Sequence, residues 1–385
     1  MSKSAITPIQ AAQVAEAVYS LKYSPIIDSH FEKTDLAEFF DFSDKPTPSA
    51  GTAQRFTAKS GVFAFKSKTG FALMAMGKKD DIYAGHAILV CRGTDSVYDW
   101  LTDANYAVVL GPSGTLVHSG FNRTFKDLLD GMMLFLGQNF PTHIHCVGHS
   151  LGGALVTLAA DWLSNNGYGV DLYTFGSPRV GTWDFASNLT NNVGRGNIFR
   201  LCHSSDPVSL VPVWPYMHAP RPDGECWVSR SASVNPEMHR IPTYAETAGA
   251  NNSWDELYCS TPTMLLEYSV RVWSTESLVA LLATTPLLAL NAILRSLCAG
   301  VAITILPGMS LLDQLSMWVE KAANISIDRA SNVRNFLLAI VKALGLAIVI
   351  PQQITHAVIR LLLEAATRAS YNQALRASAM VMSGL

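Results

Sequence analysis

The stretch that most constrains this chain is Gly-His-Ser-Leu-Gly at residues 148–152, which fits a Gly-x-Ser-x-Gly pattern. A short apolar run ends at Val147, and apolar residues then recur at helical spacing through residues 152–163. The pattern therefore predicts a buried strand, a sharp turn at Ser150 and a helix. The glycines avoid a collision in that turn, and the N–H of Leu151 is predicted to stabilise an oxyanion. The alternative is a glycine-rich turn that carries an incidental serine.

A nucleophilic serine needs a base and a carboxylate, because its hydroxyl is weakly reactive near neutral pH. When the serine lies in a turn between a strand and a helix, the carboxylate and the base are expected later in the chain, in the order Ser, Asp, His. Asp206 is the best carboxylate, since it follows a predicted strand at residues 197–203 and so lies at a carboxyl strand end. His203, His218 and His239 are the candidate bases, and spacing alone does not separate His218 from His239.

Predicted strands alternate with predicted helices over the first two thirds of the chain. The expected strands are residues 61–66, 71–76, 83–91, 143–147, 170–175 and 197–203. The expected helices are residues 8–21, with Thr7 as the N-cap, 122–136 and 152–163. A hairpin turn is expected at residues 67–70. The alternation indicates a largely parallel sheet with helices on both faces.

Length, charge and cysteine content limit the class of protein. At 385 residues the chain is long for one core, so two domains are expected, and a net charge of −2 argues against a nucleic-acid partner. The six cysteines show no metal-ligand spacing, and Cys91, Cys146 and Cys202 fall in predicted strands as buried free thiols. His143 and His145 alternate on a strand and could ligate a metal, but a packed strand is the preferred interpretation.

The composition changes near Tyr258, and residues 260–385 contain only 9 Lys/Arg and 6 Asp/Glu. Three stretches there are almost free of charge: residues 277–294, 296–312 and 335–359. Each is near the length that crosses a bilayer, although Pro286 and Pro307 would kink a span. Three interpretations stay open: a buried helical bundle that caps the first region, membrane association or insertion, and a surface covered by a partner protein.

Further motifs follow one another in a fixed order. They are residues 90–94, 99–103, 117–121, 147–154, 174–181, 206–208 and 211–212. With these segments the chain resembles the class 3 lipases, the family of the filamentous-fungal triacylglycerol lipases. The resemblance implies an α/β-hydrolase fold and a lipid ester as the substrate.

The resemblance also implies how the serine site is completed. Thr94 corresponds to the residue that supplies an oxyanion-hole N–H beside that of Leu151. The segment that begins at Asp95 and ends at Trp100 corresponds to the lid region over the serine. No metal or other cofactor is required by such a site.

The same resemblance separates the candidate bases. The family's catalytic histidine lies in a His-x-x-x-x-Tyr-like segment, which His239 and Tyr244 match. The histidine of the Tyr-x-His segment soon after the aspartate, here His218, is usually not catalytic in that family. The expected triad is therefore Ser150, Asp206 and His239, with His218 as the second-choice base.

We expect residues 1–258 to form a class 3 lipase-type α/β-hydrolase domain. Residues 259–385 are expected to form a hydrophobic helical domain that caps it or associates with a membrane. The expected activity is serine-dependent cleavage of acyl esters of membrane lipids, of lipase or phospholipase A type, through an acyl-enzyme intermediate. Two alternatives remain: a membrane-disrupting protein that uses the helical tail, and a catalytically silent lipase-like binding module.

The first ten residues lack the apolar core of a signal peptide. We therefore expect synthesis in the cytosol, followed by membrane association or export by a leaderless route, as for a secreted antibacterial effector. The expected partners are a lipid substrate and a membrane, without nucleic acid. An effector would also require a cognate chaperone or inhibitor protein.

Overall fold

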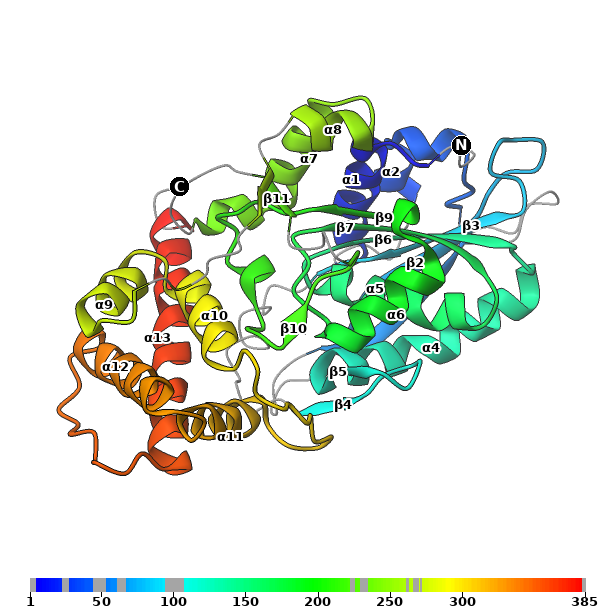
Figure 1. The fold of residues 1–385 in the computed structure, drawn as a ribbon. Coiled ribbons are helices and arrows are strands. Elements are labelled where there is room, and N and C mark those ends of the chain that lie inside the picture. Colours follow the sequence, from blue (N-terminus) through cyan, green and yellow to red (C-terminus); the bar gives the residue numbers. More distant parts are fainter. Residues whose placement is uncertain are drawn as a thin grey trace.

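A six-stranded sheet forms the centre of the first part of the chain (Figure 1). The computed structural model describes residues 5–22, 28–43, 53–60, 67–93, 107–221, 226–228, 235–260, 263–265, 270 and 272–382. The strands, in spatial order, are β1 (Gln54–Ser60), β2 (Ser67–Met76), β3 (His86–Cys91), β6 (His143–His149), β7 (Gly169–Phe175) and β9 (Ile198–Leu201). The last four are parallel to one another, whereas β1 and β2 add an antiparallel edge.

Helices cover both faces of this sheet. On one face lie α4 (Ser119–Asn139), α5 (Leu151–Asn165) and α6 (Trp183–Val193), and on the other lie α1 (Pro8–Ala17), α7 (Ile241–Gly249) and α8 (Trp254–Ser260). Successive residues of β3 alternate between the two cores, since Leu89 packs with the first helices and Val90 with the second. Both side chains are fully buried, as expected for a parallel strand covered on two sides.

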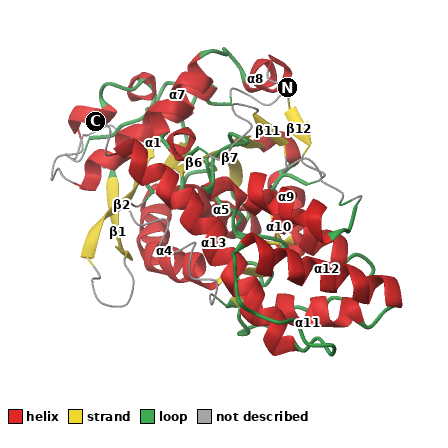
Figure 2. Ribbon diagram, turned by 90° about the vertical axis from the view of Figure 1, so that its left-hand side faces the viewer, coloured by secondary structure: helices red, strands yellow, loops and turns green. Residues whose placement is uncertain are grey.

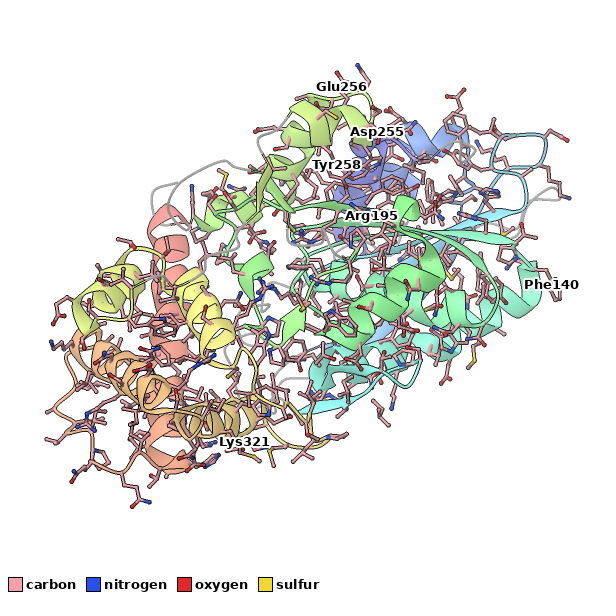
Figure 3. All side chains as sticks on the ribbon, in the orientation of Figure 1. Phe140, Arg195, Asp255, Glu256, Tyr258 and Lys321 are labelled. Atoms are coloured by element: carbon pink, nitrogen blue, oxygen red, sulfur yellow. The ribbon has the colours of Figure 1, made fainter. Side chains whose placement is uncertain are left out.

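Side-chain bonds fix several element ends. The Thr7 hydroxyl accepts from the Gln10 N–H, and the Gln10 side chain accepts from the Thr7 N–H, which forms a capping box at α1. Helix α4 ends at Asn139 and is followed by Phe140, its C-cap, which has a φ of 50° and lies exposed (Figure 3). Tyr258 of α8 covers the edge of β9, because its hydroxyl bonds both the N–H and the carbonyl of Arg200 (Figure 3).

Shorter elements complete this part. They are α2 (Asp28–Phe31), the 3₁₀ turns η1 (Val18–Lys22), η2 (Asp35–Glu38), η3 (Arg195–Asn197), η4 (Val208–Leu210) and η6 (Pro236–His239), and two small sheets. The first sheet joins β10 (Tyr216–Met217), β8 (Gly181–Thr182), β5 (Leu116–His118) and β4 (Val108–Leu110). The second pairs β11 (Cys226–Val228) with β12 (Thr263–Leu265).

The C-terminal part is helical and packs beside the sheet region (Figures 1 and 2). Its helices are α9 (Thr275–Thr284), α10 (Pro286–Leu297), α11 (Leu311–Ala323), α12 (Ile327–Ala343) and α13 (His356–Met382). They surround a third apolar core that contains Trp318 and Phe336, and Val108 and Tyr216 of the first part join it. The Asn291 side chain also accepts from the Trp214 N–H at 2.6 Å, which ties α10 to the loop before β10.

The uncharged stretches of the C-terminal part are divided between elements. Residues 277–294 pass from α9 into α10, and Pro286 is the first residue of α10, where a missing N–H costs nothing. Residues 299–310 contain no helix, and residues 344–355 link α12 to α13. No helix in the part of the chain that the structure describes is long and apolar enough to cross a membrane.

Most predicted elements are confirmed to within a few residues, but the hairpin is wrong. The turn expected at residues 67–70 is part of β2, where Ser67 pairs with Ser60. Ser-Lys-Thr-Gly has a turn-like composition, yet the strand continues through it, and Gly70 lies opposite an irregularity between Phe56 and Thr57. The strand predicted at residues 61–66 lies outside the described residues. Cys91, Cys146 and Cys202 are buried free thiols, as predicted.

Candidate active site

Ser150 lies in a sharp turn between β6 and α5. Its φ of 60° and ψ of −130° are unusual for a residue with a side chain and are held by the surrounding structure. A Cβ atom on Gly148 would lie 2.4 Å from the Gly152 carbonyl oxygen, and one on Gly152 would lie 2.1 Å from that of Cys91. The Ser150 N–H donates to the Phe175 carbonyl at 3.0 Å. Both glycines are therefore required where strand and helix approach so closely.

Three side chains from separate segments meet at this turn. His239, the last residue of η6, has its Nε2 atom 2.9 Å from Ser150 Oγ. Its Nδ1 atom lies 2.9 Å from Oδ2 of Asp206, which follows β9. Ser150 and Asp206 are buried, whereas 12% of the His239 side chain is exposed. A hydroxyl, an imidazole and a carboxylate in this order can transfer the serine proton.

Asp206 is held as an anion by a full set of donors. Oδ2 accepts from the Tyr244 hydroxyl at 2.6 Å and from the Ser209 hydroxyl at 3.2 Å, and Oδ1 accepts from the Val208 N–H at 2.8 Å. Burial alone would raise the pKa of Asp206, but His239 and these hydrogen bonds outweigh it and lower the pKa. The carboxylate can therefore orient the imidazole without taking its proton.

A second buried histidine supports the loop that carries His239. His149 has its Nδ1 atom 2.7 Å from the Tyr19 hydroxyl and its Nε2 atom 2.7 Å from the His239 carbonyl oxygen. Burial and the neighbouring His239 lower the pKa of His149 to about 3, so its ring is neutral. The neutral ring accepts from Tyr19 on one side and donates to the carbonyl on the other. The Gly93 N–H donates to the same Tyr19 oxygen at 3.1 Å.

The described residues include only one of the two predicted oxyanion-hole residues, Leu151. Leu151 is the first residue of α5, a position whose N–H has no partner within its own helix. Thr94, and the predicted lid from Asp95 to Trp100, lie outside the described residues. Gly93 comes directly before them, and a Cβ atom there would lie 2.9 Å from Ser150 Cβ, so the chain passes beside the serine at this point. The oxyanion roles of Thr94 and Leu151 stay predictions.

The other candidate bases make different contacts. The Nε2 atom of His218 lies 2.9 Å from the Ser209 carbonyl oxygen. His203 stacks on Tyr244, with ring centroids 4.1 Å apart, and bonds the Met238 carbonyl oxygen at 2.8 Å. His239 therefore occupies the place between Ser150 and Asp206. That this row of residues is catalytic stays a prediction.

The sequence interpretation missed the residues that support the triad. The spacing of Tyr244 from His239 does not reveal the bond that the Tyr244 hydroxyl donates to Asp206. Ser209 of η4 and Tyr19 of η1 carry no signal in the sequence, because only the fold brings these two short turns to the site. The five-residue step from His239 to Tyr244 was the one available clue, since it places both on the segment that enters α7.

The sequence comparisons extend over part of the chain. The family model described as Lipase (class 3) matches residues 88–216. A secreted mono- and diacylglycerol lipase A of Penicillium camembertii is 36% identical over 152 residues, which are 37% of this chain and 48% of that protein. A secreted mono- and diacylglycerol lipase 1 of Fusarium solani is 35% identical over 139 residues, 34% of this chain and 41% of that protein. This chain thus spans less than half the length of either lipase.

Two further comparisons are more limited. Toxin TseL of Vibrio cholerae is 36% identical over 104 residues, 26% of this chain and 16% of that protein. The solved structure of a mono- and diacylglycerol lipase from Aspergillus oryzae covers 58% of this chain and 79% of its own, with a TM-score of 0.41 and 24% identity.

These findings confirm the resemblance expected from the motifs. Residues 88–216, which hold Ser150 and Asp206, match the family model of the class 3 lipases. The parallel sheet with its serine turn after β6 and helices on both faces is an α/β-hydrolase fold, as predicted. The predicted C-terminal helical region is also present.

The expectation about cellular location is wrong. We expected a chain made in the cytosol and then membrane-associated or exported by a leaderless route. Two relatives are named as secreted lipases, which contradicts that expectation. The expectation rested on the composition of residues 1–10 alone, and the composition of ten residues does not identify a route of export.

Proposed function

We propose that the chain is a serine-dependent lipid ester hydrolase of lipase or phospholipase A type. The observation that carries the proposal is the row of Ser150, His239 and Asp206, in which both contacts are 2.9 Å long. The match of residues 88–216 to the class 3 lipase family model supports a lipid ester as the substrate.

In the proposed acylation step, Ser150 Oγ attacks the ester carbonyl carbon while His239 Nε2 takes the hydroxyl proton. Asp206 stabilises the imidazolium through Nδ1, and the N–H groups of Leu151 and Thr94 bind the oxyanion. The tetrahedral intermediate then breaks the bond to the alcohol oxygen, which leaves with the proton from His239. The acyl group remains on Ser150 as an ester.

Deacylation repeats the same steps with water as the nucleophile. His239 takes a proton from the water, whose oxygen attacks the acyl carbon, and returns the proton to Ser150 Oγ as the fatty acid leaves. The neutral His149 ring supports this cycle, because its bond to the His239 carbonyl keeps the catalytic loop in place while the imidazole changes charge. His239 accepts and then returns the proton in both steps of this scheme.

We also propose that the enzyme acts at a lipid surface outside the producing cell. The two relatives named as secreted lipases support secretion. The proposed division is a hydrolase domain at residues 1–258 and a helical domain at residues 259–385. The third apolar core, which is formed mainly by the C-terminal helices and contains Trp318 and Phe336, supports that division. The low charge of residues 260–385 supports docking on membrane lipid, where the substrate resides.

The test is fatty-acid release from phospholipid vesicles and from diacylglycerol emulsions by the full chain. We expect release from at least one of them, and Ser150→Ala should lower the rate by roughly 10⁶-fold, to background. Ser164→Ala is the matched control, because Ser164 lies in α5, the helix that follows Ser150, and its hydroxyl donates to the Asp161 carbonyl. Folded wild-type protein that cleaves neither lipid, or a Ser150→Ala variant that keeps the activity, would overturn the proposal.

A toxin-like role is a second candidate, supported by the similarity to Toxin TseL. In that role the enzyme cleaves membrane lipids of a competing cell, and the producer carries a cognate inhibitor or chaperone. Periplasmic expression in a bacterial host tests it: wild type should stop growth and Ser150→Ala should not. Growth arrest by both variants would indicate membrane disruption without hydrolysis instead.

A further inference from the structure

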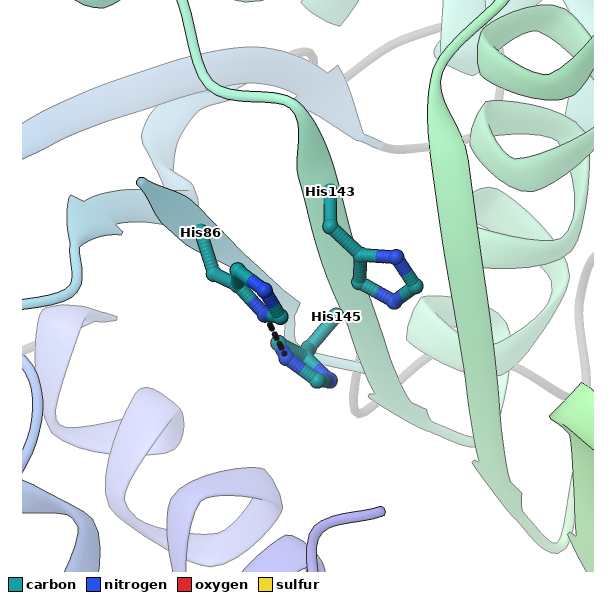
Figure 4. Close-up of side chains that lie close together, drawn as sticks. All are labelled: His86, His143 and His145. Atoms are coloured by element: carbon teal, nitrogen blue, oxygen red, sulfur yellow. Dashed lines mark hydrogen bonds between the residues drawn. The ribbon is translucent and has the colours of Figure 1, made fainter. Parts of the chain in front are cut away.

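Three histidines gather at the end of the sheet opposite Ser150 (Figure 4). His86 opens β3 and His143 opens β6, and the two are directly paired across the parallel strands. His145 follows two residues later on β6, so its side chain lies on the same side as that of His143. The cluster is about 16 Å from the serine, given five residues of strand at about 3.3 Å each.

The three rings are spaced as ligands of one ion. Their centroids lie 4.8 Å apart for His86 and His143, 5.0 Å for His143 and His145, and 5.2 Å for His86 and His145. Three imidazoles bound to a tetrahedral zinc ion, at about 2.0–2.1 Å from metal to nitrogen, have centroids about 5 Å apart. One nitrogen from each ring lies within 4.8 Å of the others, so binding requires the rings to turn inward by about 1 Å.

Asp171 of β7 provides the carboxylate that usually accompanies such ligands. Its Oδ2 atom lies 3.2 Å from His143 Nε2 and 3.4 Å from His145 Nδ1, and the Tyr173 hydroxyl donates to it at 3.4 Å. A carboxylate behind a metal-binding histidine fixes the ring and raises its basicity. His145 shows this arrangement, because its Nδ1 atom faces Asp171 while its Nε2 atom faces His86 Nδ1 at 3.0 Å.

The cluster is poorly explained as packing. A buried imidazole nitrogen is costly unless it is hydrogen-bonded, and an apolar side chain would fill the same space without that cost. His143 Nε2 is buried and makes no hydrogen bond within the described part of the chain, although Asp171 lies near it.

We propose that His86, His143 and His145 bind one Zn²⁺ ion, with Asp171 orienting the imidazoles. Imidazole nitrogens favour zinc over magnesium or calcium, which prefer oxygen ligands. The ion joins β3 to β6 at the amino ends of the strands and completes its coordination with water. His143 keeps 25% of its side chain exposed, which leaves an entry path from solvent. The site stabilises the sheet and is separate from ester cleavage.

The test is zinc titration of the chelator-treated full chain by calorimetry. We expect one Zn²⁺ per chain and a higher melting temperature with zinc than without it. His86→Gln and His143→Gln should each weaken binding at least 100-fold, and Asp171→Asn should weaken it about 10–100-fold. His239→Gln and the exposed His30→Gln are the controls and should bind zinc as the wild type does.

Equal zinc affinity in the wild type and the cluster variants would overturn the proposal. Loss of zinc in His239→Gln would do the same, because it would place the ion at the serine site. If the cluster variants do not fold, X-ray absorption at the zinc edge of the wild type decides the matter. Three imidazole ligands are expected there, and one or none would contradict the site.

Discussion

Histidines lie beside a buried aspartate near both ends of strand β6, but the arrangements differ. At the carboxyl end one imidazole, His239, separates Asp206 from the Ser150 hydroxyl. At the amino end several imidazoles gather around one carboxylate, and His143 and His145 both face Asp171. The first geometry suits the proposed transfer of a proton from Ser150 to His239, whereas the second suits the proposed binding of one metal ion. A histidine beside an aspartate is therefore proposed to transfer a proton where a serine hydroxyl faces the imidazole, and to bind a metal where other imidazoles face it.

The largest expected difference comes from the two aspartates. Asp206→Asn should lower the rate constant for ester cleavage by about 10⁴-fold, because the amide favours the wrong tautomer of His239. Asp171→Asn should leave that rate unchanged within about twofold, since it lies at the far end of the sheet. Steady-state kinetics on a soluble short-chain ester measures both. Equal losses in the two variants would show that the two ends are coupled or that the fold is damaged.

A smaller effect is expected from the acid sensitivity of His149. Its folded pKa of about 3 lies below the ordinary 6.5, so between these values the unfolded chain binds the extra proton. Stability should therefore fall as the pH drops through this window, by up to about 1.4 kcal/mol per pH unit from this group. His149→Gln should flatten that slope in denaturant unfolding curves, and His30→Gln should not. If His149→Gln keeps the wild-type dependence of the unfolding free energy on pH, His149 is not the cause of that dependence.

The smallest effect is expected from the two tyrosines that reach the aspartates. The Tyr244 hydroxyl lies 2.6 Å from Asp206, while that of Tyr173 lies 3.4 Å from Asp171. Tyr244→Phe should lower the free energy of unfolding by about 1–2 kcal/mol and slow ester cleavage several-fold. Tyr173→Phe should leave ester cleavage unchanged. If Tyr173→Phe slows ester cleavage more than Tyr244→Phe does, the carboxyl end of β6 is not the site of ester cleavage.

The carboxyl end of the sheet was largely predictable from the sequence. The turn at Ser150 is local, because Gly148, Gly152 and the flanking strand and helix lie within one stretch. Asp206 could be found because carboxyl strand ends meet at one edge of a parallel sheet. His239 required the family resemblance, since its loop returns to the serine through contacts with His149 and Tyr19 that no spacing reveals.

The amino end was not predictable to the same degree. The pair His143 and His145 was visible as an alternation on one strand, but His86 is 57 residues away from His143. Only the parallel register of β3 with β6, which pairs these two residues, brings the third ring into place. Asp171 likewise arrives through the pairing of β7 with β6. Register depends on the packing of the whole sheet and cannot be read from one segment.

The central claim is that Ser150 is the nucleophile, and covalent labelling tests it most directly. A fluorophosphonate should add once to the wild-type chain, and peptide mass spectrometry should place the adduct on Ser150. Ser150→Ala should not be labelled, and His239→Ala should be labelled at least 100-fold more slowly, because no base then takes the serine proton. An adduct on another residue, or equally fast labelling of Ser150→Ala, would contradict the account.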